Sequence, residues 1–277
     1  MHTRARAVTT GALLLFGFGL EAAQTAAPLF PDPALEAAVR WYVFAKRDNK
    51  EPITEDDVKN LSTVQANGKG IKSLAGLEKC KSLMLLEVGS NQISDLAPLK
   101  DLSLIQSLTL ANNQITDIAP LAGLVRLQYL NLTGNQVADI GPLAKLDAMN
   151  SLYLSNNKIS DIGPVSGLKK LWSLYVDGNQ VADLKPVSSL PGLSSLDARG
   201  NKIRDLTPLA GLTRLWHAYL DRNAIRDLAP FIELGKKEGN TPRFITLAGN
   251  PLSAAAKTTQ IAELKKMWFN VSLEPTK

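Results

Sequence analysis

Residues 83–104 read LMLLEVGSNQISDLAPLKDLSL, and the next stretch, residues 105–126, reads IQSLTLANNQITDIAPLAGLVR. The two stretches align without a gap at most of their aliphatic positions and at one asparagine, one aspartate and one proline. Such a regular period indicates a chain built from stacked copies of one structural unit. A constant step of 22 residues joins seven of these asparagines: Asn91, Asn113, Asn135, Asn157, Asn179, Asn201 and Asn223.

The spacing within a unit predicts one short strand followed by a return segment. Leu86 and Val88 lie two positions apart, so both side chains point to the same, inward side of a strand. The chain then turns at Asn91 and passes Asp95 and Pro98, residues that favour turns and the start of short 3₁₀ or helical segments. Because one unit cannot bury its apolar stripe alone, the units must stack. Stacking places a parallel sheet on the concave side, with strands about 4.8 Å apart, and the short helical turns on the convex side.

The repeated asparagines and the single cysteine are expected to be structural. A buried amide needs all its hydrogen bonds satisfied, and the backbone of adjacent turns can supply them. Cys80 is the only cysteine, so the chain forms no intramolecular disulfide. It lies in the same register as Leu102 and Leu124, which predicts a buried apolar side chain and not a reactive thiol.

Both ends of the repeat array differ from the units and are predicted to be caps. Asp32 and Pro33 are typical of a helix start, and Thr54-x-x-Asp57 resembles a capping box, so residues 28–60 are predicted to form a helical N-terminal cap. Residues 61–252 are predicted to be the repeats. They comprise a degenerate first unit with Lys69 at the asparagine position, seven regular units over 83–234, and a degenerate last unit.

The C-terminal end departs from the period. Residues 235–243 add five positions before a last strand near residues 244–247. Residues 253–277 are then predicted to form a capping helix and tail, in which Ile261, Leu264 and Trp268 face inward.

Residues 1–27 have the pattern of a secretory signal peptide. Arg4 and Arg6 precede an apolar stretch at 7–20, which is short for a bilayer span, and small residues follow it. We expect cleavage between residues 22 and 27, a secreted or periplasmic protein, and no transmembrane segment after cleavage. An uncleaved anchor is the alternative.

Charge and residue inventory exclude several classes of function. The net charge of +5 is spread along the chain in runs of no more than two basic residues, which gives no support to nucleic-acid binding. The sequence shows no His/Cys metal cluster, no GxGxxG and no phosphate loop. His217 is the only histidine left after cleavage, and no nucleophile accompanies it. We therefore expect a protein that is not an enzyme and that uses no cofactor or metal.

The register also identifies side chains on the inner face of the sheet. Four of the five tyrosines fall on this face, with two tryptophans at its rim. Tyr, Trp and Arg contribute most of the energy at protein interfaces, although tyrosine is also simply a good strand residue. The predicted ligand patch consists of Tyr129, Tyr153, Trp172, Tyr175, Asp177, Asp197, Arg199, Trp216, His217, Tyr219 and Asp221.

The 22-residue unit with N-x-I-x-D-I-x-P-L resembles the internalin-type leucine-rich repeats of bacterial surface and secreted proteins. It is also similar to the eukaryotic nuclear repeat proteins that regulate protein phosphatase 1. The preceding stretch, FPDPALEAAV…EPITEDDVKNL…NGKGIKSLAGLE, resembles the helical cap found before internalin-type repeats. The resemblance covers residues 30 to about 256. It implies an α/β leucine-rich-repeat solenoid, curved and used for protein–protein recognition.

Three functions remain open from the sequence. The first is an exported module, monomeric, that binds another protein or peptide on its concave face. The second is binding of a carbohydrate or another cell-envelope polymer, because Tyr and Trp faces also stack on sugars. The third is an intracellular regulatory subunit of a protein phosphatase, which requires that residues 1–27 are not a signal peptide.

Overall fold

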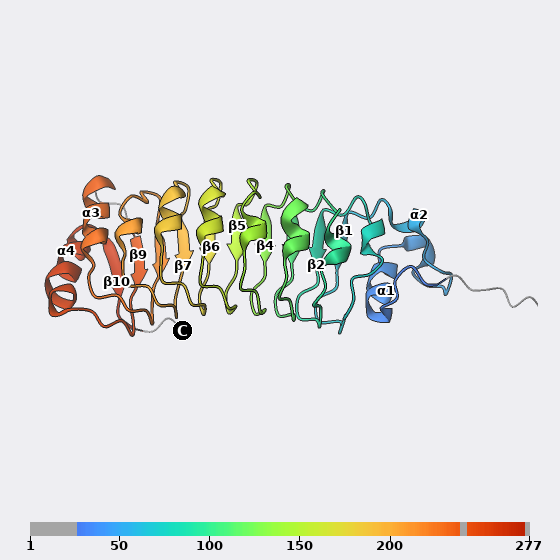
Figure 1. Ribbon diagram of the computed structural model, residues 1–277, viewed down its shortest axis with the longest axis horizontal. Coiled ribbons are helices and arrows are strands. Elements are labelled where there is room, and N and C mark those ends of the chain that lie inside the picture. The colour runs from blue at the N-terminus through green and yellow to red at the C-terminus, as the bar shows by residue number, and fades with distance from the viewer. Residues whose placement is uncertain (1–26, 239–242, 275–277) are drawn as a thin grey trace, which may run out of the picture.

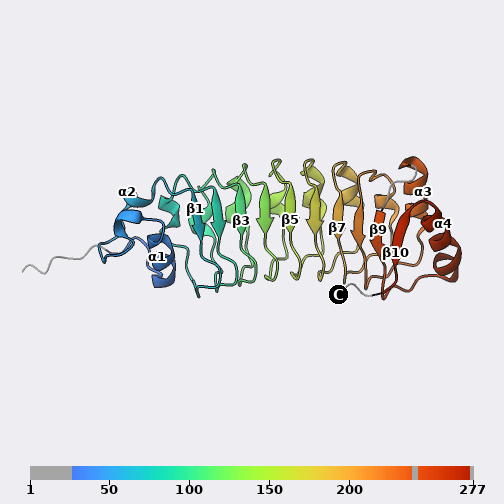
Figure 2. The same ribbon diagram turned by 180° about the vertical axis from the view of Figure 1, so that it is seen from behind.

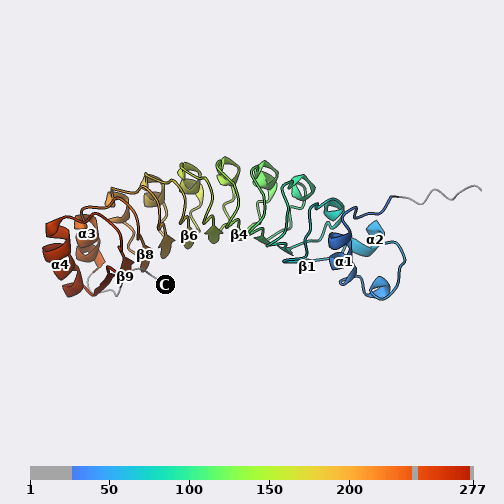
Figure 3. The ribbon, with the colours of Figure 1, turned by 90° about the horizontal axis from the view of Figure 1, so that it is seen from below.

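The computed structural model describes residues 27–238 and 243–274, so the predicted signal peptide lies outside the described residues except for Ala27. Ten parallel strands form one sheet in simple chain order, from β1 to β10. Figure 1 shows the strands as a single row, and Figure 3 shows that the row bends into an arc with the strands on its inner side. The predicted α/β leucine-rich-repeat solenoid with a concave parallel sheet is therefore confirmed.

Each strand is short because the chain must turn back within the same unit. Helical segments cover the two ends of the row, as the view from behind also shows (Figure 2). The strands are β1 (Thr63–Gln65), β2 (Leu85–Glu87), β3 (Ser107–Thr109), β4 (Tyr129–Asn131), β5 (Ser151–Tyr153), β6 (Ser173–Tyr175), β7 (Ser195–Asp197), β8 (His217–Tyr219), β9 (Arg243–Thr246) and β10 (Phe269–Ser272).

The sheet register places equivalent residues of successive units side by side. Leu86 pairs with Leu108, and Leu108 pairs with Leu130, so each buried strand leucine contacts the next one along the solenoid. All three are fully buried, and so is Cys80. The apolar columns therefore form one continuous core along the solenoid, as the sequence period predicts.

The repeated asparagines connect each turn to the one before it. The Asn135 amide donates to the carbonyl of Leu110 at 3.0 Å and of Leu132 at 2.9 Å, and its oxygen accepts from the Ile115 N–H at 3.0 Å. Two of these three partners belong to the preceding unit. The same pattern repeats at Asn91, Asn113, Asn157, Asn179, Asn201, Asn223 and Asn250. The asparagines are therefore structural, as predicted.

The convex side carries the predicted aspartate–proline turns. An Asp95 carboxylate oxygen accepts the Ala97 N–H at 2.8 Å, and a 3₁₀ turn over Ala97–Leu99 follows with Pro98 inside it. Leu99 is fully buried beneath this turn. Equivalent aspartate bonds occur at Asp117, Asp139, Asp161, Asp183, Asp205 and Asp227.

The N-terminal cap begins as predicted. Asp32 caps α1 (Pro33–Arg40) by accepting from the N–H groups of Ala34 and Leu35. Its second oxygen accepts from the backbone of the first, degenerate unit, at Lys72 and Ser73. A single carboxylate therefore starts the helix and attaches the cap to the repeats.

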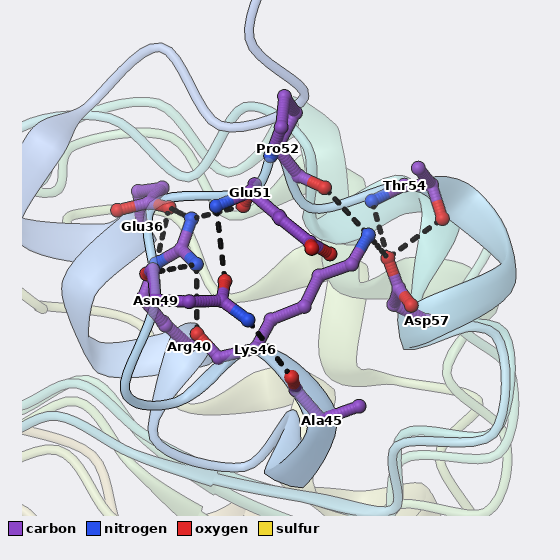
Figure 4. Close-up of polar contacts among 9 residues, drawn as sticks. All are labelled: Glu36, Arg40, Ala45, Lys46, Asn49, Glu51, Pro52, Thr54 and Asp57. Atoms are coloured by element: carbon purple, nitrogen blue, oxygen red, sulfur yellow. Dashed lines mark hydrogen bonds and ion pairs between the residues drawn. The ribbon is translucent and has the colours of Figure 1, made fainter.

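The loop between α1 and α2 (Glu55–Val58) is held by two cations (Figure 4). Arg40 donates to Glu36 and to the carbonyls of Lys46, Asn49 and Glu51. The Lys46 ammonium donates to the carbonyl of Pro52 and, at 2.7 Å, to the carboxylate of Asp57.

The C-terminal cap differs from the prediction at its last turn. Helix α3 (Ala229–Glu238) is followed by β9, a π-helical turn (Ala256–Gln260) and α4 (Ile261–Lys266). Ile261 and Leu264 are buried as predicted, but Trp268 is 59% exposed and has a left-handed φ of 66°. That conformation ends the helix, so Phe269 is buried in its place and begins the unpredicted strand β10. The alternation in Phe269-Asn-Val-Ser is the strand signal that the helical interpretation overlooked.

The capping box at α2 predicts acid sensitivity of the N-terminal cap. The hydrogen bond from Lys46, with those from Thr54, lowers the pKa of Asp57 from 3.8 to about 2. A lowered carboxyl pKa contributes stability that is complete above 3.8 and is lost as the pH falls toward 2. Asp57→Asn should remove this pH dependence and expose the amides of residues 45–58 to faster hydrogen exchange at neutral pH.

Asp56→Asn is the matched control, because that neighbouring carboxylate is 87% exposed and bonds only at the surface to Lys59. Equal hydrogen-exchange protection of the cap in the two variants would contradict the role given to Asp57.

Candidate functional site

The candidate site lies on the inner face of the sheet, where side chains alternate with the buried strand leucines. Parallel pairing in register turns residues 22 positions apart into neighbours across the sheet. Residues at the same position of successive units form a column across the sheet. In one column Tyr153 pairs with Tyr175, Tyr175 with Asp197, and Asp197 with Tyr219. Tyr129 lies on β4 in the neighbouring column, where it pairs with Ser107 and Ser151. All four predicted tyrosines therefore share this face, where each is half-buried.

Three of the tyrosines form a continuous aromatic row. The rings of Tyr129 and Tyr153 are 5.4 Å apart and tilted by 43°, whereas those of Tyr153 and Tyr175 stack at 4.6 Å and 19°. The Tyr175 hydroxyl lies 3.3 Å from the Ser195 hydroxyl. Burial, together with the neighbouring tyrosines, raises the pKa of Tyr153. Rings held in this way present a rigid apolar surface with polar tips, at little cost in side-chain entropy on binding.

A second aromatic group lies toward the C-terminal end of the same face. The ring of His217 lies 6.2 Å from Tyr219 and 6.5 Å from Phe244, and Tyr219 lies 6.1 Å from Phe244. Phe244 is absent from the predicted patch, yet β9 pairs it with His217. Because five extra positions precede β9, Phe244 lies 27 residues after His217 and not 22. A fixed step of 22 residues therefore does not identify Phe244, although it belongs to the same column as His217.

An ion pair separates the two aromatic groups. Asp197 is 2% exposed and accepts from Nε of Arg199 at 2.9 Å and from Nη2 at 2.6 Å. The Arg199 guanidinium also lies over the Tyr219 ring, 5.6 Å from its centroid. Burial raises the pKa of Asp197, and the hydrogen bonds from Arg199 oppose that rise.

The sequence register predicts that Asp197 and Asp221 are exposed on the inner face, and this prediction is wrong because both side chains are buried. Asp221 is 3% exposed, and its carboxylate accepts the Ala248 N–H at 2.7 Å. Asp177 is half-buried and accepts the Ser155 hydroxyl. These short acidic side chains at the ends of strands accept hydrogen bonds from neighbouring protein groups, such as the Ala248 N–H and the Ser155 hydroxyl. They therefore hold those groups in position and present little surface to a ligand.

Both predicted rim tryptophans are exposed, Trp172 by 63% and Trp216 by 55%. They stand on either side of a surface cleft of about 690 Å³. Sequence reasoning did not connect the tryptophans with a cleft or with the cations beside them. Other residues lining the cleft are Lys169, Lys170, Ser194, Arg214 and His217.

Two further observations concern metal-binding side chains and the Cys80 thiol among the described residues. Across residues 27–238 and 243–274, no group of three or more His, Cys, Asp or Glu side chains is placed to hold a metal ion. Burial, with a smaller effect of Glu78, raises the pKa of the Cys80 thiol to about 12. Within the same residues, every helix is too short or too polar to span a lipid bilayer.

Comparison with known proteins agrees with this architecture. A family model described as leucine-rich repeats (2 copies) matches residues 104–145. The crystal structure of an internalin C2 from Listeria monocytogenes is 36% identical to the chain, with a TM-score of 0.72 over 81% of this chain and 95% of that one. The chain therefore belongs to the internalin-type leucine-rich-repeat proteins. No curated protein matches the sequence.

Two further structures show how widely the fold is shared. An internalin (inlF) from the same species is 25% identical over 91% of this chain and 94% of its own, with a TM-score of 0.57. The plant peptide hormone receptor RGFR1, in complex with RGF2, is 20% identical over 73% of this chain and 34% of its own, with a TM-score of 0.62. The likeness to the plant receptor concerns the fold alone.

The buried ion pair makes a prediction about pH and stability. Arg199→Ala should lower the free energy of unfolding at neutral pH by about 3 kcal/mol, because the Asp197 carboxylate stays buried without its counter-charge. Asp197 has a raised pKa in the folded state, so the loss should shrink as the pH falls and the carboxyl takes up a proton. Urea unfolding followed by circular dichroism across the acid range measures both effects.

The double variant Asp197→Asn with Arg199→Ala is the control for this ion pair. It should be more stable at neutral pH than Arg199→Ala alone, since no buried charge remains. A pH-independent loss in the single variant would show that Arg199 acts only by packing.

Proposed function

We propose that the protein is an exported, non-enzymatic module that binds another protein or peptide on its concave face. The observation that carries the proposal is the row of Tyr129, Tyr153 and Tyr175 on that face, flanked by exposed tryptophans. Half-buried tyrosines whose rings contact one another lose little entropy on binding and combine apolar area with hydroxyl groups. Interfaces of many kinds use this residue type at their centres.

The curvature of the solenoid supports the same proposal. A concave sheet lets several units contact one partner at once, and solenoid proteins use such surfaces for binding. RGFR1 is described as a plant peptide hormone receptor in complex with RGF2, which supports the compatibility of this fold with a peptide partner. Export is proposed from the sequence pattern at residues 1–27, and we propose that the protein acts as a monomer.

The test begins with identification of the partner. Crosslinking is performed with the full chain in the native organism, and the medium, the envelope and the cytosol are analysed separately. The exported-module proposal expects a specific protein or peptide from the medium or envelope. Recovery only of a cytosolic phosphatase would favour the regulatory-subunit alternative, and recovery only of an envelope polymer would favour the carbohydrate alternative.

Replacing the stacked tyrosines should weaken binding of the identified partner. Tyr153→Ala combined with Tyr175→Ala is expected to raise the Kd at least about tenfold, because both anchor rings are lost from the centre of the face. Calorimetric titration measures the change in affinity, and circular dichroism verifies that the fold is retained.

Phe44→Ala provides a matched control, since this aromatic side chain is 80% exposed on the N-terminal cap, away from the concave row. An unchanged Kd in the tyrosine variant, or an equal loss in the control variant, would reject the assignment of the concave face.

A further inference from the structure

We propose that the cleft between Trp172 and Trp216 binds an acidic, proline-rich peptide segment in the polyproline II conformation. The inference rests on the proposed function, because it specifies one part of the partner that the concave face and its rim would bind. It adds a ligand class and a docking geometry to that function.

The cleft is built from a local motif that occurs twice. Lys170-Leu171-Trp172 and Arg214-Leu215-Trp216 occupy the same register two units apart, and Gly192-Leu193-Ser194 occupies the unit between them. The three leucines are buried, so the residues on either side of each leucine project from the solenoid surface. A cation and an indole therefore stand on each side of a gap, and the unit between them lines the cleft only with the small residues Gly192 and Ser194.

The backbone fixes the positions of both tryptophans. The Trp172 carbonyl accepts from the N–H groups of Ser194 and Ser195, at 2.9 and 3.1 Å. The Trp216 N–H donates to the Ser194 carbonyl at 2.9 Å. The backbones of the two tryptophans are consequently held one unit to either side of Ser194.

Trp172 and Trp216 differ in residue type from the earlier positions of their column. The equivalent positions in the preceding units hold Met84, Gln106, Gln128 and Asn150. Large apolar side chains gathered on a surface commonly mark an interaction site. The cleft of about 690 Å³ between them has the size of a pocket for a compact ligand or a short peptide segment.

The spacing of the tryptophans favours one peptide conformation. Trp172 and Trp216 lie two units apart, and two strand spacings of the parallel sheet amount to about 9.6 Å. A polyproline II helix rises about 3.1 Å per residue with three residues per turn, so residues i and i+3 lie on one face about 9.3 Å apart. In an extended strand, side chains on one face recur about every 6.6 Å, which does not fit the two-step spacing. Aromatic-lined grooves are also the established way in which proteins bind polyproline II segments.

The charged side chains around the cleft indicate the charge that its ligand must carry. Among the described residues that line it, Lys169, Lys170 and Arg214 are cationic and none is a carboxylate. Arginine binds carboxylates with two parallel hydrogen bonds, and a basic surface attracts an acidic partner. A repeat of Pro-Pro-Glu therefore fits the cleft, since its prolines face the indoles while its glutamates face the cations.

The test uses synthetic peptides and the full chain. Fluorescence anisotropy measures binding of a labelled Pro-Pro-Glu repeat peptide, with Pro-Pro-Lys and Ala-Gly-Glu repeats as controls for charge and for conformation. Only Pro-Pro-Glu should bind, with an affinity that falls as salt is added. Trp172→Ala and Trp216→Ala should each weaken binding about tenfold or more.

A steric variant tests the gap directly. Ser194→Trp places a third indole between the two tryptophans and should abolish peptide binding. Gln106→Trp adds an indole to the same column outside the cleft and should leave binding unchanged. Circular dichroism verifies the fold of each variant.

Several results would overturn the proposal. These are equal binding of the control peptides, Pro-Pro-Glu binding that survives Ser194→Trp, or no peptide binding while an acidic polysaccharide binds in a tryptophan-dependent way. Failure here is distinguishable from failure of the proposed function, which is read from the natural partner and the Tyr153 and Tyr175 double variant. If that variant loses the partner while no peptide binds, only the peptide class assigned to the cleft is wrong.

Discussion

The buried asparagine amide is the interaction on which the remainder of this molecule depends. At each step its oxygen accepts an N–H from the preceding turn, as Asn113 does from Ile93, while its amino group donates to carbonyls of the preceding and its own unit. In the turn that follows each strand, backbone bonds between units pair only some of the groups, such as the Ser90 N–H with the Ala111 carbonyl, and leaving the remaining buried groups unsatisfied would be costly. The asparagine removes that cost and sets the distance at which the next unit stacks.

Because the units stack at a constant step, residues at the same position of successive units form a continuous surface. Residues 22 positions apart become neighbours across the sheet, so a tyrosine in three successive units becomes a row and two tryptophans in alternate units become the sides of a cleft. The apolar columns provide the stability, and the columns between them are free to vary. A recognition surface can therefore be altered one position at a time without changing the core.

The columns account for what could be predicted from the sequence. The strand leucines, the asparagines, the burial of Cys80 and the shared face of the tyrosines all follow from counting by 22. The predictions that were wrong concern residues whose environment does not depend on their position in the 22-residue unit. The burial of Asp197 depends on the guanidinium of Arg199, and the exposure of Trp268 depends on a left-handed residue at the end of α4. Phe244 was overlooked because the five extra positions shift it out of phase with His217.

Native-state hydrogen exchange tests the central claim most directly. The amides of Ile93, Ile115 and Ile159 lie outside the strands and donate to asparagine side chains. If the asparagine ladder holds the stack together, these amides should exchange as slowly as the amides of the neighbouring strands, through global unfolding. Exchange at the rate of exposed loops would show that apolar packing and the strand hydrogen bonds hold the stack without the asparagines, and would contradict the account.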